Sequence, residues 1–73
     1  MTDSATIRVK VNGEQRTLPG GLNLLGALEA LGYQPRLVVV EYNGEILVRS
    51  AWADRLVVET DVLEVVTIVG GGS

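Results

Sequence analysis

Only one stretch of this chain has the apolar period of a helix. Between Asn23 and Leu31 the apolar residues recur at positions i, i+3, i+4 and i+7 and form one stripe. The stripe consists of Leu24, Ala27, Leu28 and Leu31. Asn23 is the expected N-cap, and Gly32 and Pro35 are expected to end the helix. Since the other apolar segments have the composition of strands, the fold has to pack this helix on a sheet.

The segment before the helix predicts a β-hairpin. Residues 6–11 alternate strictly, and their apolar members Ile7, Val9 and Val11 share one face. The dipeptide Asn12-Gly13 tolerates the positive φ angles of a type I′ turn, so residues 15–18 can return as the second strand.

The segment after the helix predicts a second hairpin. Residues 37–42 are β-branched and almost all apolar, which is typical of an interior strand covered on much of both faces. Asn43-Gly44 is a further hairpin signal and leads into residues 46–48. Trp52 follows in a short capped turn, where we expect it to anchor the packing at the edge of the core.

Residues 62–69 predict the final strand, and both of its faces are partly apolar. Leu63 and Val65 are expected to point inward, which places Val66 and Ile68 on the opposite face beside Glu64. Two interpretations stay open. Val66 and Ile68, with Val69, form a docking patch next to the C-terminus, or they are central-strand residues that the protein itself covers.

The order of these elements predicts an α+β fold of the β-grasp, or ubiquitin-like, type. In this fold a mixed sheet of four to five strands wraps around one helix, and the last strand lies parallel to the first. We expect one domain over residues 1–73, with residues 1–5 disordered and residues 70–73 as a flexible tail.

Composition argues against several classes of function. The 73 residues include no cysteine and no histidine, which removes disulfides, most zinc sites and the usual nucleophile systems. We therefore expect neither an enzyme nor a metal or cofactor bound by this chain. The net charge of −3 disfavours nucleic acid as a partner. The apolar runs are too short to span a bilayer and no secretory signal is present, so the expected location is the cytoplasm.

The chain ends in Val69-Gly70-Gly71-Gly72-Ser73, and glycine has no Cβ. A Gly-Gly segment can therefore lie extended in a channel that is too narrow for other residues, and can present a carboxylate inside a partner. Four residues reach at most roughly 13 Å beyond the strand. The alternative is a frayed terminus or a remnant of a Gly-Ser linker.

Over nearly its whole length the chain resembles the ThiS family of sulfur carriers in thiamin biosynthesis. The resemblance rests on several segments in order, together with the short total length. These segments are residues 9–13, the helix ending in Leu31-Gly32, residues 39–46, Ser50-Ala51-Trp52, residues 61–66 and residues 69–72.

The resemblance implies a protein co-substrate, not a catalyst. A ThiF-like adenylating enzyme would use ATP and magnesium to adenylate the carboxylate of Gly72, with Gly70 and Gly71 threading into its active site. A sulfurtransferase persulfide would then displace AMP and, after reduction, leave a thiocarboxylate. Thiazole synthase would accept this sulfur, and we expect the free carrier to be a monomer.

Two residues depart from the family pattern. Thr60 precedes Asp61 where relatives often have glycine, so we expect the turn into the last strand to be built differently. Ser73 follows the glycine at which relatives end. Three explanations stay open: Ser73 is removed before activation, Ser73 is a remnant of cloning, or the carrier is inactive as encoded.

Three other functions stay open beside the thiamin carrier. One is the small subunit of molybdopterin synthase, which has the same fold and tail chemistry. Another is a carrier for tRNA thiolation or cysteine synthesis. The third is a β-grasp binding module whose glycines have no chemical role.

Overall fold

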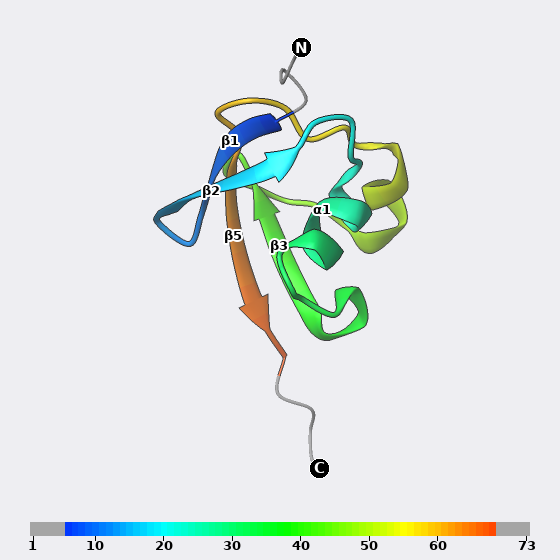
Figure 1. Ribbon diagram of the computed structural model, residues 1–73. Helices are drawn as coiled ribbons and strands as arrows, with labels where there is room; N and C mark the ends of the chain where they lie inside the picture. The colour runs from blue at the N-terminus through cyan, green and yellow to red at the C-terminus, as the bar shows by residue number, and fades with distance from the viewer. Residues whose placement is uncertain (1–5, 69–73) are drawn as a thin grey trace.

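The computed structural model describes residues 6–68 and contains one five-stranded sheet. The strand order is β2-β1-β5-β3-β4, so the last strand lies in the middle of the sheet (Figure 1). The strands are β1 (Thr6–Val11), β2 (Glu14–Pro19), β3 (Val38–Tyr42), β4 (Glu45–Ile46) and β5 (Val62–Thr67). β5 is parallel to β1 and antiparallel to β3, which makes the sheet mixed and confirms the predicted β-grasp topology.

Both Asn-Gly dipeptides form the turns that the sequence predicts. Asn12 and Gly13 have φ angles of 52° and 84°, and Asn43 and Gly44 have φ angles of 51° and 90°. Positive φ at both central residues defines a type I′ turn, whose twist matches that of the flanking strands. These turns set the antiparallel pairs β1–β2 and β3–β4.

The only α-helix in residues 6–68, α1 (Leu24–Ala30), lies on one face of the sheet (Figure 1). Its N-cap is Asn23, whose side-chain oxygen accepts a hydrogen bond of 2.8 Å from the backbone N–H of Gly26. Gly32 follows the helix with a φ of +95°, the left-handed conformation that commonly ends helices. Two short 3₁₀ helices, η2 (Pro35–Leu37) and η3 (Arg49–Asp54), complete the fold.

The core lies between the helix and the inner face of the sheet. Trp52 in η3 is buried there and donates its indole N–H to the carbonyl of Leu47 at 2.8 Å, as expected of a packing anchor. The other buried apolar residues are Val9, Val11, Leu18, Leu24, Ala27, Leu28, Val38, Val40, Tyr42, Val57, Leu63 and Val65.

The prediction for residues 37–42 was partly wrong. Leu37 belongs to η2, and the strand begins at Val38. Val38 and Val40 are buried, but Val39 between them is 39% exposed. Successive residues of a strand point to opposite faces, and no described element of this chain lies over the second face of β3. Within residues 6–68, β3 is therefore covered on one side only.

Candidate functional site

The outer face of the sheet, opposite α1, carries an apolar cluster at the end of β5. Its members are between 38% and 67% exposed. We call this cluster the outer patch, and it consists of Leu37, Val39, Ile46, Val48, Val66 and Ile68. Residues 69–73 follow it directly in the sequence.

Strand register brings these residues together from three segments. Val66 on β5 lies directly opposite Val39 on β3, so both side chains are on the same face. The backbone N–H of Ile68 donates to the carbonyl of Leu37, at 2.6 Å, and continues this pairing by one more row. On the other side of β3, the N–H of Leu47 donates to the carbonyl of Val40 at 3.1 Å, which places Val48 beside Val39.

Two carboxylates lie next to the outer patch. Glu41 on β3 is directly opposite Glu64 on β5, and Ile46 on β4 is opposite Glu41. The three residues therefore form one row across the outer face, adjacent to the row of Val39 and Val66. Like charges in directly opposite positions destabilise a sheet. The outer face thus combines exposed apolar side chains with a concentrated negative charge.

The opposite end of β5 is held by a buried carboxylate. Asp61 is 7% exposed, and its side chain accepts hydrogen bonds from the Tyr42 hydroxyl, from Nδ2 of Asn43 at 3.1 Å and from the backbone N–H of Val58 at 2.9 Å. Burial and the hydrogen bond to Asp61 raise the pKa of Tyr42 above its ordinary range. The Tyr42 hydroxyl therefore stays protonated and remains a donor to Asp61.

Asn12 connects the β1–β2 turn to the middle of β5. Its side-chain Oδ1 accepts from the backbone N–H of Val65 at 2.7 Å, and its Nδ2 donates to the carbonyl of Val65 at 3.1 Å. The amide thus binds both polar groups of one residue, as a neighbouring strand would do. Since β1 pairs with β5 only at Val62 and Leu63, Asn12 extends the support of β5 beyond the end of β1.

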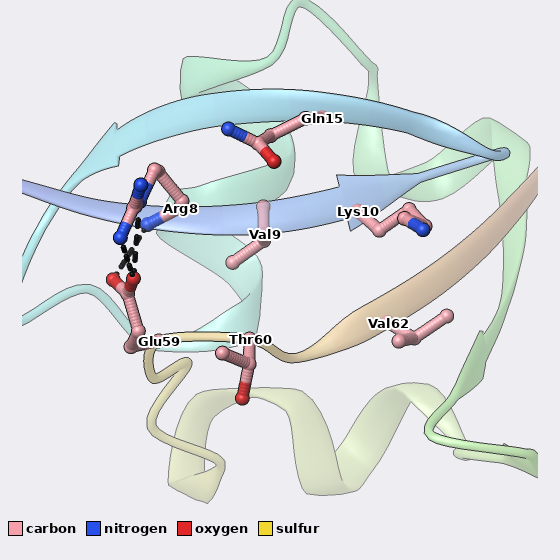
Figure 2. Close-up of a pocket in the computed structure, with 7 residues that line it drawn as sticks. All are labelled: Arg8, Val9, Lys10, Gln15, Glu59, Thr60 and Val62. Atoms are coloured by element: carbon pink, nitrogen blue, oxygen red, sulfur yellow. Dashed lines mark hydrogen bonds and ion pairs between the residues drawn. The ribbon is translucent and has the colours of Figure 1, made fainter.

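A hollow of about 420 Å³ lies on the outer face near the start of β5 (Figure 2). The guanidinium of Arg8 is paired there with the carboxylate of Glu59 at 3.0 Å, and Lys10 lies toward the other end of the hollow (Figure 2). Its lining residues are Arg8, Val9, Lys10, Gln15, Glu59, Thr60 and Val62. This hollow is at the opposite end of β5 from the outer patch.

Thr60 has a φ angle of +71°, although it is β-branched. The backbone N–H of Asp61 donates to the carbonyl of Val58 at 3.2 Å and closes a four-residue turn with Thr60 at its third position. Positive φ at the third position is typical of a type II turn, where glycine is favoured. The threonine therefore adopts a conformation that glycine takes without strain, and this explains why glycine suits the position.

The predicted site residues fall into two groups. Val66 and Ile68 are exposed, so the interpretation that the protein itself covers them is wrong. Val69, Gly70, Gly71, Gly72 and Ser73 lie outside the described residues. The sequence pattern did not indicate four further members of the outer patch: Leu37, Val39, Ile46 and Val48. Only the pairing of β5 with β3 and of β3 with β4 reveals that they belong together.

Within residues 6–68 we found no group of three or more acidic, histidine or cysteine side chains able to hold a metal ion. The same residues contain no helix with the length and apolarity needed to cross a membrane.

Comparison with known proteins gives consistent matches. The family model of the ThiS family matches residues 9–72. The crystal structure of the thiamine biosynthesis protein ThiS from Geobacter metallireducens is 38% identical, with a TM-score of 0.75, and the alignment covers 90% of this chain and all of that one. The solution structure of a thiamine biosynthesis protein from the same organism is 37% identical, with a TM-score of 0.73, and the alignment covers 92% of this chain and 90% of that one.

Curated relatives are of two kinds. A protein named thiazole synthase from Paramagnetospirillum magneticum is 37% identical over 92% of this chain, but the match spans only 21% of that protein. The chain thus spans about a fifth of the length of the thiazole synthases that it matches. The uncharacterized protein ycf40 of Trieres chinensis is 34% identical over 85% of both chains. The family model covers most of the chain and the fold agrees with it, so the chain belongs to the ThiS family of sulfur carriers.

Proposed function

We propose that this protein carries sulfur for the thiazole moiety of thiamin as a thiocarboxylate on Gly72. The observation that carries the proposal is the outer patch, which lies immediately before the glycine segment in the chain. An exposed apolar surface of this kind is typical of a docking site, and the glycines supply a C-terminus without side chains. The family match ends at residue 72, which supports Gly72 as the reacting residue.

The chemistry needs an activating partner, because a carboxylate is a poor acyl donor. A carboxylate oxygen of Gly72 attacks the α-phosphorus of ATP, and pyrophosphate leaves to give an acyl adenylate. The terminal sulfur of a partner's persulfide then attacks the carbonyl carbon, and AMP leaves. A thiol reductant supplies two electrons that cleave the resulting S–S bond, which releases the thiocarboxylate and the partner's thiol. ATP and magnesium belong to the ThiF-like enzyme in this scheme.

The role of this chain is to bind and to present its C-terminus. In our scheme the outer patch docks on the adenylating enzyme while Gly70 and Gly71 enter the active site. Ser73 has to be removed first, since its presence moves the reactive carboxylate one residue beyond Gly72. Thiazole synthase is the proposed acceptor, and two relatives with that name favour it over molybdopterin synthase.

Intact-mass spectrometry tests this proposal. The chain ending at Gly72 is incubated with a ThiF-like enzyme, ATP and a persulfide donor with a thiol reductant. We expect a product heavier by the difference between one sulfur and one oxygen atom, and no such product when ATP is omitted. The matched control ends at Gly70, which keeps the outer patch and removes the reacting residue. If the chain ending at Gly70 is charged equally well, or if the chain ending at Gly72 is never charged, the proposal fails.

Purified acceptors separate the thiamin carrier from its alternatives. We expect the thiocarboxylate to support thiazole formation by thiazole synthase. Sulfur transfer to molybdopterin instead would identify the second candidate. A binding module would retain its partner and its cellular phenotype after deletion of Gly71 and Gly72.

A further inference from the structure

Glu41 and Glu64 form an uncompensated pair of carboxylates within an apolar surface. They lie directly opposite each other on β3 and β5. Val62 and Val66 flank Glu64 along its own face of β5, and both are exposed. Paired residues of antiparallel strands have Cα atoms roughly 4.5–5.5 Å apart, so the two side chains leave neighbouring backbone positions on the same face.

Nothing in the described part of the chain neutralises this pair. Neither carboxylate accepts a hydrogen bond there, and the ion pair that the structure contains, Arg8 with Glu59, lies near the start of β5. Lys10 is the basic residue nearest to Glu64 in the strand register. It lies opposite Val62, which precedes Glu64 by two residues on the same face of β5. It is not within ion-pair distance of Glu64. The arrangement therefore costs stability and gives no compensating contact within these residues.

We propose that Glu41 and Glu64 together bind an arginine of the adenylating enzyme, with apolar side chains of that enzyme resting on the outer patch. This inference rests on the proposed function, since it specifies the surface of the enzyme that charges Gly72. A guanidinium presents several N–H donors in one plane and can bridge two carboxylates, which an ammonium does less well. It is also less strongly hydrated, so it suits a site bordered by valines.

Other occupants fit the face less well. A metal ion lacks the three or more ligands that a protein site needs, because the described residues offer two carboxylates here. A membrane with anionic lipids would be repelled by the two glutamates and by the net charge of −3. A second copy of this chain has the same net charge of −3, so two copies repel each other.

Charging kinetics test the pair by comparing the wild-type sequence with the double variant Glu41→Gln/Glu64→Gln, both as chains that end at Gly72. The matched control is Glu14→Gln/Glu45→Gln, which removes the same charge from exposed positions outside the row. We expect the KM of the adenylating enzyme for the double variant to rise by roughly ten- to hundredfold, the effect of losing charge-assisted hydrogen bonds. We expect kcat to stay unchanged, and the control to behave like the wild type.

Salt and thermal unfolding separate binding from a structural effect. The wild-type KM should rise with ionic strength, and the KM of the double variant should depend on it much less. The double variant should melt at the same or a higher temperature than the wild type, because a repulsion has been removed. A lower melting temperature together with a higher KM would indicate a structural cause and overturn the inference.

The remaining outcomes separate this inference from the proposed function. A double variant charged with wild-type KM would refute the inference and leave the function intact. If the wild type is not charged, calorimetric titration of both chains with the enzyme replaces KM by the dissociation constant. Wild-type binding that the double substitution weakens would support the inference while the proposed function fails. Absence of any binding would overturn both, and self-association lost in the double variant would identify a second copy as the occupant.

Discussion

Replacement of Thr60 by glycine is expected to stabilise this protein. Thr60 has a φ angle of +71°, in the left-handed region where a Cβ approaches the following carbonyl oxygen. Its side chain is exposed, so its removal costs little burial. Its backbone N–H donates to the carbonyl of Arg8 at 2.8 Å, a bond that glycine retains. The substitution therefore changes mainly the conformational energy of one residue.

The net effect is the difference between two terms. The left-handed conformation costs a residue with a Cβ about 1–2 kcal/mol. Glycine loses about 0.5–1 kcal/mol more conformational entropy on folding than a residue with a side chain. The substitution Thr60→Gly should thus raise the free energy of unfolding by about 0.75 kcal/mol, the midpoint of a difference that spans about 0 to 1.5 kcal/mol. For a domain of this size, the midpoint corresponds to an increase in Tm of roughly 3–6 °C.

Thermal and urea denaturation followed by far-UV circular dichroism measure this change. The matched control is Thr17→Gly in the middle of β2, where the threonine is also exposed but has no positive φ. The control should destabilise the protein, because glycine weakens a strand without relieving strain. Asparagine tolerates positive φ better than other residues with a Cβ, so Thr60→Asn should give a smaller gain than glycine. If Thr60→Gly lowers the free energy of unfolding as Thr17→Gly does, the strain argument is wrong.

Three further predictions concern the groups that hold β5. Asp61→Ala should lower the free energy of unfolding by about 2–4 kcal/mol in urea titrations, because it leaves three donors around a buried position without their acceptor. Asn12→Gly keeps the positive φ but removes the amide from Val65; it should cost about 1–2 kcal/mol and speed amide hydrogen exchange at Val65. The backbone N–H of Arg8, followed by its side chain, lowers the pKa of Glu59 below 4.5. Because this pKa is lower in the folded protein than in the unfolded chain, the ionised carboxylate of Glu59 stabilises the fold at pH values above the unfolded-state pKa. The wild type should therefore be more stable than Glu59→Gln at neutral pH, and this difference should disappear as the pH falls below 4.5.

Local signals in the sequence were sufficient to predict most of the fold. Asn12-Gly13 and Asn43-Gly44 form type I′ turns because few other residues adopt positive φ at both positions without strain. The helix follows the apolar stripe and begins at its predicted cap, Asn23. The parallel placement of β5 beside β1 also agrees with the prediction. These features depend on neighbouring residues or on the order of the elements, and both can be read from one sequence.

The outer patch could be predicted only in part, because it depends on contacts between distant segments. The alternation within β5 indicated that Val66 and Ile68 share a face. It did not show whether another part of the chain covers that face. Val39 comes from a strand whose composition suggested burial on both sides, and its exposure depends on which face of the sheet the helix covers. The pairing of Glu41 with Glu64 likewise depends on register between residues 23 positions apart.

The two ends of β5 differ in a way that suits a carrier. As far as Val65 the strand has hydrogen-bond partners on both sides, from β3 and from β1 with Asn12. Beyond Val65, the described hydrogen bonds come from one side only, from β3 and from Leu37 just before it. The charged groups that stabilise the fold, Asp61 and the pair of Arg8 with Glu59, lie near the start of the strand. A partner that grips the outer patch and the following glycines therefore acts on the end of β5 with the fewest internal contacts, and the groups that hold the fold together stay in place.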